Sequence, residues 1–160
     1  MQNKDCTPDV FTTAKGLAGG LPMGAFFLNE KTEDILQPGD HASTFGGNPI
    51  VAAAANAVLD VFNKENILNA VKENSSYFVE SLKKLQQKYN VIKDIRGVGF
   101  LLGIEIDYSA AELVKELLEH HIVTVPAGTS VVRFLPPLII KKEEIDLVLN
   151  ALEQIFKKRT

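Results

Sequence analysis

The chain has 160 residues, of which 46% are hydrophobic and 23% charged, a composition typical of a soluble globular protein with a buried core. Its net charge of -3 includes no basic block, which argues against nucleic acid as a partner. The single cysteine, Cys6, excludes an internal disulfide and fits a reducing compartment; residues 1–5 lack a signal-peptide core, and no apolar stretch could span a bilayer. We therefore expect a cytoplasmic protein with no membrane partner.

Lys15 lies in a glycine-rich stretch between two predicted short strands, residues 10–13 and 25–28. It is the only ionisable residue between Asp9 and Glu30. An ammonium group in apolar surroundings loses solvation and reacts more readily as the free amine, which is what a Schiff-base lysine needs. The same pattern also describes a loop lysine that points into water, the usual place for this residue.

A second group of polar residues comes just before an alanine-rich predicted helix, residues 50–63, which Asn48 is expected to cap. Ser43 and Thr44 are followed by two glycines, so hydroxyl groups and main-chain N–H groups meet at a helix N-terminus. This is the composition of an anion site, although it also fits a turn whose hydroxyls bond locally. Together with Lys15, this anion site has the groups that bind pyridoxal phosphate (PLP): an amine for the aldehyde and hydroxyls for the phosphate.

The second half of the chain alternates predicted helices and strands. A long helix over residues 65–89 has one apolar stripe: Leu68, Val71, Ser75, Phe78, Leu82, Leu85 and Tyr89. Apolar residues then alternate with a period of two from 98 to 106, which predicts a strand. Further elements are a helix opened by a Ser109–Glu112 capping box, strands over residues 122–125 and 131–135, and a closing helix over residues 143–158.

These elements predict two parts of unequal completeness. The last ninety or so residues suffice for a small α/β domain. The first sixty or so offer two strands and one helix, too few for a covered sheet. We therefore divide the chain into residues 1–64, part of a larger domain, residues 65–90, a connecting helix, and residues 91–160, a complete small domain.

Arg133 is the third candidate functional residue. Its predicted strand is apolar, so a partly buried guanidinium at this position needs an anion, either a ligand or a structural partner such as Glu105. The three histidines, at positions 41, 120 and 121, have no partners at metal-ligand spacing, so we expect no metal site.

The chain resembles the class III PLP-dependent aminotransferases over nearly its whole length. Three segments carry the resemblance: residues 8–25, with Thr-Thr-Ala-Lys-Gly; residues 39–49, with His-Ala-Ser-Thr-Phe-Gly-Gly-Asn-Pro; and residues 131–138, with Val-Val-Arg-Phe-Leu-Pro-Pro-Leu. The resemblance implies an α/β protein of PLP-dependent transferase fold type I. Residues 1–64 would then be the C-terminal portion of the PLP-binding large domain.

The resemblance also implies roles for individual residues. Lys15 would bind the cofactor covalently and move the substrate's proton. Thr44 would bind the cofactor phosphate across a homodimer interface, and Ser43 would lie near the substrate. Arg133 would bind a substrate carboxylate or pair with an acidic residue from the upstream half.

Within the class, the chain is most similar to the enzymes that transfer the amino group of N2-acetyl-L-ornithine to 2-oxoglutarate in arginine biosynthesis. Ornithine, succinylornithine and 4-aminobutyrate aminotransferases are the alternatives. The matched segments are those of the C-terminal part of such an enzyme, without the acidic residue for the pyridine nitrogen or the glycine-rich phosphate loop. We therefore expect the isolated chain to be inactive, and a non-catalytic folding or association module is a further alternative.

Overall fold

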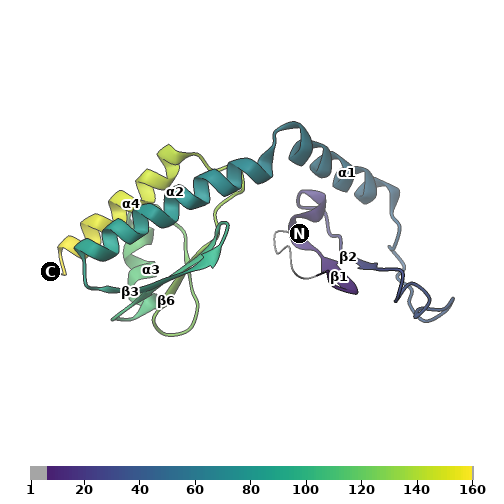
Figure 1. The fold of residues 1–160 in the computed structure, drawn as a ribbon, viewed down its shortest axis with the longest axis horizontal. Helices are drawn as coiled ribbons and strands as arrows, with labels where there is room; N and C mark the ends of the chain where they lie inside the picture. The colour runs from purple at the N-terminus through teal and green to yellow at the C-terminus, as the bar shows by residue number, and fades with distance from the viewer. Residues whose placement is uncertain (1–6, 160) are drawn as a thin grey trace. The chain divides into compact units, whose positions relative to one another are not determined.

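The computed structural model describes residues 7–159, so Cys6 and the N-terminal start lie outside the described residues. The chain divides into two compact units, Met1–Glu65 and Asn66–Thr160 (Figure 1). None of the helices within the described range is long and apolar enough to cross a membrane.

The first unit is built on an antiparallel pair of short strands. β1 (Val10–Thr13) runs alongside β2 (Ala25–Leu28), with Val10 opposite Leu28 and Thr13 opposite Ala25, which confirms both predicted strands. Between them lies the short 3-10 helix η1 (Lys15–Ala18). Large apolar side chains of the pair, including Phe11 and Phe27, are more than 40% exposed. A two-stranded ribbon with such exposure does not form a core of its own.

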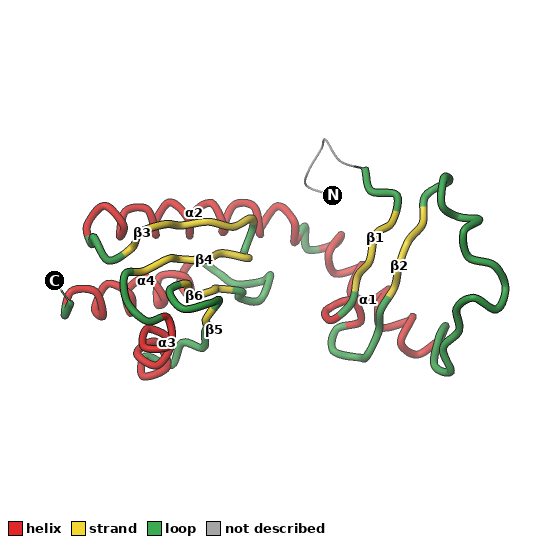
Figure 2. Tube along the Cα trace, turned by 90° about the horizontal axis from the view of Figure 1, so that it is seen from below, coloured by secondary structure: helices red, strands yellow, loops and turns green. Residues whose placement is uncertain are grey.

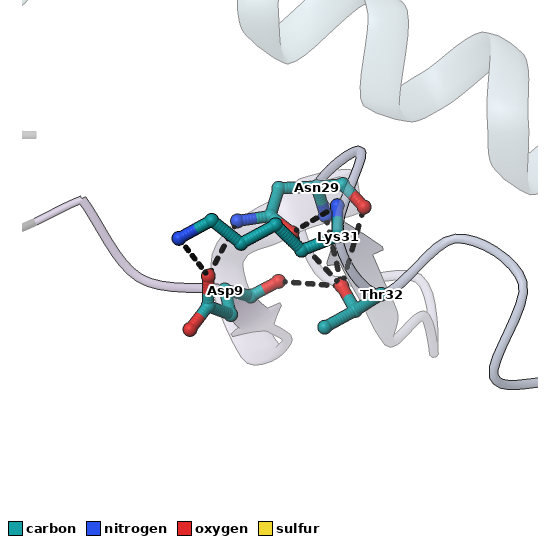
Figure 3. Close-up of polar contacts among 4 residues, drawn as sticks. All are labelled: Asp9, Asn29, Lys31 and Thr32. Atoms are coloured by element: carbon teal, nitrogen blue, oxygen red, sulfur yellow. Dashed lines mark hydrogen bonds and ion pairs between the residues drawn. The ribbon is translucent and has the colours of Figure 1, made fainter.

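One end of this ribbon is closed by a polar cluster around Asp9 (Figure 3). The Asn29 amide donates to the Asp9 carboxylate at 2.7 Å, and the Thr32 hydroxyl donates to the Asp9 main-chain oxygen at 3.0 Å. The Lys31 ammonium lies 3.6 Å from the same carboxylate. These contacts join the start of β1 to the end of β2, at the end of the ribbon away from Lys15.

Helix α1 (Pro49–Lys64) completes the first unit, and its start follows the prediction. The Asn48 side chain accepts hydrogen bonds from the main-chain N–H groups of Ile50 and Val51, at 3.0 and 3.3 Å. Proline at the first helical position has no N–H that would need a partner. The helix packs against η1, where a Cβ added to Gly19 would lie 3.3 Å from a Val58 methyl carbon.

The second unit is a four-stranded antiparallel sheet with helices packed on it (Figure 2). The sheet order is β3 (Ile92–Val98), β4 (Leu101–Ile106), β6 (Val131–Phe134), β5 (Val125–Pro126). Helices α2 (Ile67–Lys88) and α4 (Lys142–Lys157) lie behind the sheet in the view of Figure 2, and α3 (Ala110–Glu119) lies along the β5 side.

The core of the second unit lies between the helices and one face of the sheet. Phe78 on α2 meets Phe134 on β6 edge to face, with ring centres 5.5 Å apart. Other fully buried side chains come from all layers: Leu82, Leu102, Ile104, Ile106, Leu113, Leu117, Val132, Ile145, Leu152 and Phe156. Burying this many large side chains is the main stabilising contribution.

Several local predictions for this unit are wrong. Leu68 is exposed, and Ile67, four residues before Val71, takes its place in the buried stripe of α2. The alternating run from 98 to 106 is broken by a turn at Gly99, whose φ is +57°, and the predicted strand over residues 122–125 shrinks to Val125–Pro126.

The predicted capping box at the start of α3 does not form. The Ser109 side chain makes no capping hydrogen bond. The Glu112 carboxylate accepts instead from the Arg159 guanidinium at 2.6 Å. A tertiary ion pair has therefore replaced the local bond that the sequence spacing favours.

Candidate functional site

Lys15 stands where the chain turns out of β1. It is the first residue of η1 and has a φ of +58°, in the left-handed region that non-glycine residues rarely adopt. Its side chain is exposed, and the structure gives it no hydrogen bond or ion pair to any described residue. Left-handed backbone at a lysine costs free energy and is concentrated at functional sites. The side chain is therefore accessible and not committed to a partner among residues 7–159.

The loop before α1 carries Ser43 and Thr44, and both are exposed. The Ser43 main-chain oxygen accepts from the Gly46 N–H at 2.9 Å, and a Cβ on Gly46 would lie 3.1 Å from that oxygen. The turn therefore needs the small residue. No hydrogen bond from either hydroxyl to a described residue is found, so both remain available as donors.

A cavity of about 890 Å³ lies within the first unit. Ser43 lines it together with Thr12 and Thr13 at the end of β1, whereas Lys15 and Thr44 do not. The remaining lining residues are Pro22, Met23, Gly24, Ala25, Phe26, His41, Phe45, Gly46, Gly47, Asn48, Val51 and Ala52. The cavity thus combines hydroxyl groups with the N-terminus of α1, a combination that suits an anionic group.

Among the described residues that line this cavity, His41 is the one that is ionisable, and its imidazole meets the Phe26 ring edge to face with centres 5.7 Å apart. From the sequence, His41 is considered only as a metal ligand, and it has no partner at the required spacing. Its position two residues before Ser43 is the sequence signal that places it at the same cavity.

Arg133 belongs to the second unit and lies on β6 opposite Gly103 of β4 and Val125 of β5. The expectations of partial burial and of an ion pair with Glu105 are both wrong. The side chain is exposed, and the Glu105 carboxylate is bound by Arg96 at 2.7 Å. Arg133 makes no hydrogen bond or ion pair with any residue in the range 7–159.

The family to which the chain belongs follows from comparison with known proteins. The class-III aminotransferase family matches residues 1–156, nearly the whole length. The chain is a member of this family.

Several relatives with curated names are acetylornithine aminotransferases. The acetylornithine aminotransferase of Methanocaldococcus jannaschii is 43% identical over 149 residues, which are 93% of this chain and 37% of that protein. The acetylornithine aminotransferase of Thermosynechococcus vestitus is 46% identical over 152 residues, which are 92% of this chain and 37% of that protein. The chain thus spans well under half the length of these relatives.

Solved structures show the same fold. The acetylornithine aminotransferase of Elizabethkingia anophelis matches 96% of this chain and 40% of its own, with a TM-score of 0.88 and 32% identity. An ornithine aminotransferase of Toxoplasma gondii, whose active site is described as partly occupied by PLP, matches 96% of this chain and 37% of its own, with a TM-score of 0.88 and 33% identity. The expected α/β fold of the PLP-dependent aminotransferases is therefore confirmed.

The first unit has the chemical groups that PLP needs. The unpaired amine of Lys15 suits the aldehyde, and the free hydroxyls of Ser43 and Thr44 with the glycine N–H groups suit the phosphate. PLP is the cofactor of this family, and the donors present in the chain fit it.

Proposed function

We propose that this chain is the C-terminal part of an aminotransferase that moves the amino group of N2-acetyl-L-ornithine to 2-oxoglutarate in arginine biosynthesis, in the cytoplasm. The names of the curated relatives support this substrate. The observation that carries the assignment in the structure is Lys15, a free amine held in a left-handed turn at the end of a strand. In this proposal, residues 1–64 belong to the large domain, residues 65–90 connect, and residues 91–160 are the small domain.

Each candidate residue has one task. The Lys15 amine binds the cofactor aldehyde and, once released by the substrate, takes the proton from the carbon that bears the transferred amino group, which is Cδ in N2-acetyl-L-ornithine because its α-amino group is acetylated. When bound, PLP supplies the electron sink for the charge left at that carbon. Ser43 lies beside the substrate, and Arg133 pairs with a substrate carboxylate, for which a guanidinium offers two parallel N–H donors.

The role proposed for Thr44 requires a homodimer. Thr44 and Lys15 do not meet at the cavity of the first unit, and Thr44 is exposed without a partner among the described residues. A hydroxyl presented outward in this way suits a phosphate held by the other subunit. We therefore propose that Thr44 donates to the cofactor phosphate of the partner subunit.

The test of the lysine is trapping with borohydride in the full-length protein that contains this segment. After incubation with PLP and reduction, peptide mapping should find the adduct on Lys15. Lys15→Arg should abolish the adduct and the transamination rate. Lys31→Arg is the matched control, because Lys31 is also exposed and near the ribbon but is paired with Asp9. An adduct that survives in Lys15→Arg would refute the assignment.

The same trapping on the 160-residue chain separates the enzyme from the non-catalytic module. We expect no adduct on the isolated chain, because the groups that hold the pyridine ring lie outside the matched segments. An adduct on Lys15 of the isolated chain would show that these residues suffice for cofactor binding.

Ornithine aminotransferase is the second candidate, because solved ornithine aminotransferases match the fold as well as the acetylornithine enzyme does, with TM-scores of 0.88. Steady-state kcat/KM of the full-length protein with acetylated and free ornithine decides between them. Higher kcat/KM for the free amino acid would refute our choice of substrate.

A further inference from the structure

Two arginines face each other across a glycine on the sheet of the second unit. Gly103 on β4 pairs with Arg96 on β3 and, on its other side, with Arg133 on β6. Direct partners in antiparallel strands project their side chains from the same face. Ile104 and Val132 point to the opposite face and are fully buried, so the two arginines lie on the face away from that core.

Glu105 lies on the same face, two residues along β4 from Gly103, and is diagonal to both arginines. Diagonal neighbours in a sheet are within reach of long side chains. In the structure the carboxylate of Glu105 accepts a hydrogen bond from Arg96 at 2.7 Å, and Arg96 also donates to Asp94 at 2.5 Å. One arginine thus holds both carboxylates, and Arg133 has no hydrogen-bond or ion-pair partner among the described residues.

The ion pairs of Arg96 shift the pKa values of the groups involved. The pKa of the Arg96 guanidinium is raised by its hydrogen bonds to Glu105 and Asp94, and the pKa of Asp94 is lowered by Arg96. Exposed ion pairs of this kind add little to stability. Their consequence for Arg133 is larger, because without Arg96 the carboxylate of Glu105, diagonal to Arg133 on the adjacent strand, would have no partner among the described residues.

We infer that Arg96 is a positioning residue for Arg133. Arg96 binds Glu105, and this keeps the Glu105 carboxylate away from the Arg133 guanidinium, which receives the carboxylate of the substrate. The inference rests on the proposed function of Arg133. It assigns to Arg96 no contact with substrate. Glu105 is the competitor that Arg96 removes.

The kinetic test uses the full-length enzyme and the KM for the dicarboxylic oxo acid. Arg96→Gln should raise this KM about two- to fivefold, the size of one exposed charge interaction, with kcat unchanged. Arg96→Gln with Glu105→Gln should return the KM to the wild-type value, because the competing carboxylate is gone. Arg96→Lys should stay near wild type, because lysine can still hold Glu105.

The comparison with Arg133→Gln separates this inference from the proposed function. If Arg133→Gln raises the KM and Arg96→Gln does not, the positioning role is refuted and the role of Arg133 stands. If Arg133→Gln leaves the KM unchanged, the proposed role of Arg133 itself fails. In the double variant of both arginines, a further rise in KM beyond Arg133→Gln would show a merely structural effect and also refute the inference.

A spectroscopic test needs no activity. The chain has three arginines, at positions 96, 133 and 159, so their side-chain Nε–Hε NMR signals in the 160-residue chain are few enough to assign by substitution. We expect the Arg133 signal to be unaffected by Glu105→Gln in the wild-type background and to shift with it in the Arg96→Gln background. An Arg133 signal that responds to Glu105→Gln while Arg96 is present would overturn the inference.

Discussion

The guanidinium carbon of Arg159 lies 3.8 Å from the centre of the Tyr108 ring. The same guanidinium donates to the carboxylates of Glu112 and Glu116 on α3, at 2.6 and 2.7 Å, and the Tyr108 hydroxyl donates to Glu116 at 3.2 Å. The residues after α4 are thereby fastened to α3. Burial and the charge of Glu116 raise the pKa of Tyr108, and the two carboxylates raise the pKa of Arg159.

Arg159→Ala should lower the free energy of unfolding by about 1 kcal/mol, because it removes a cation–π contact and leaves two carboxylates side by side. Urea unfolding followed by circular dichroism measures this. Lys158→Ala is the control: its side chain is exposed and makes no bond to the described residues, so it should change stability by less than about 0.5 kcal/mol. Equal losses in the two variants would contradict the fastening role.

The raised pKa of Tyr108 predicts the sign of a pH dependence. A free tyrosine titrates near 10.0, so below that pH Tyr108 is protonated in both states and its full contribution to stability is present. As the pH rises above 10.0, the unfolded chain releases this proton first, and the free energy of unfolding falls. Tyr108→Phe should therefore lose stability less steeply in this range. A slope identical to that of the wild type in urea titrations would refute the assignment.

The elements that the sequence predicts correctly are those with local signals. Asn48 before a proline marks the start of α1, because the side-chain oxygen and the missing N–H both act within one turn. The apolar stripe of α2 is predicted for all but its first member, since a spacing of three and four residues defines a helix face wherever the partner lies.

The predictions are wrong where a contact between residues far apart in the sequence, or a residue with left-handed backbone, determines the structure. Glu112 is bound to Arg159, 47 residues away, and Glu105 is bound to Arg96 across two strands rather than to Arg133. Neither pairing can be deduced from spacing in the sequence. Arg159 is far from Glu112 along the chain, and both Arg96 and Arg133 are within reach of Glu105 once the sheet forms. Motifs in the sequence indicate the candidate site residues. Of these, Ser43 lines the cavity of the first unit, and its meeting there with His41, Thr12 and Thr13 depends on tertiary structure.

Asn48→Ala should destabilise α1 by about 1 kcal/mol, since two N–H groups at its first turn lose their acceptor. Hydrogen exchange of α1 amides in the 160-residue chain should become faster. Asn56→Ala makes the same chemical change in the exposed middle of the helix and should slow exchange slightly, because alanine is the better helix former. Faster exchange in Asn56→Ala than in Asn48→Ala would refute the capping role.

Gly97→Ala should be among the most damaging single substitutions in the second unit. The residue has a φ of +139°, and an added Cβ would lie 2.0 Å from the main-chain oxygen of Leu101, so the β3–β4 pairing would have to move. We expect a loss of more than about 3 kcal/mol in the free energy of unfolding.

Gly128→Ala separates backbone strain from this clash. Gly128 also has a positive φ, +80°, but nothing lies within 4 Å of the added Cβ. It should lose only about 1 kcal/mol, the cost of a left-handed alanine. Urea unfolding of the two variants gives both values. The difference between them combines the contact with Leu101 and the greater strain of an alanine at φ +139° than at +80°. Similar losses would mean that β3 and β4 are not as close at this turn as the structure places them.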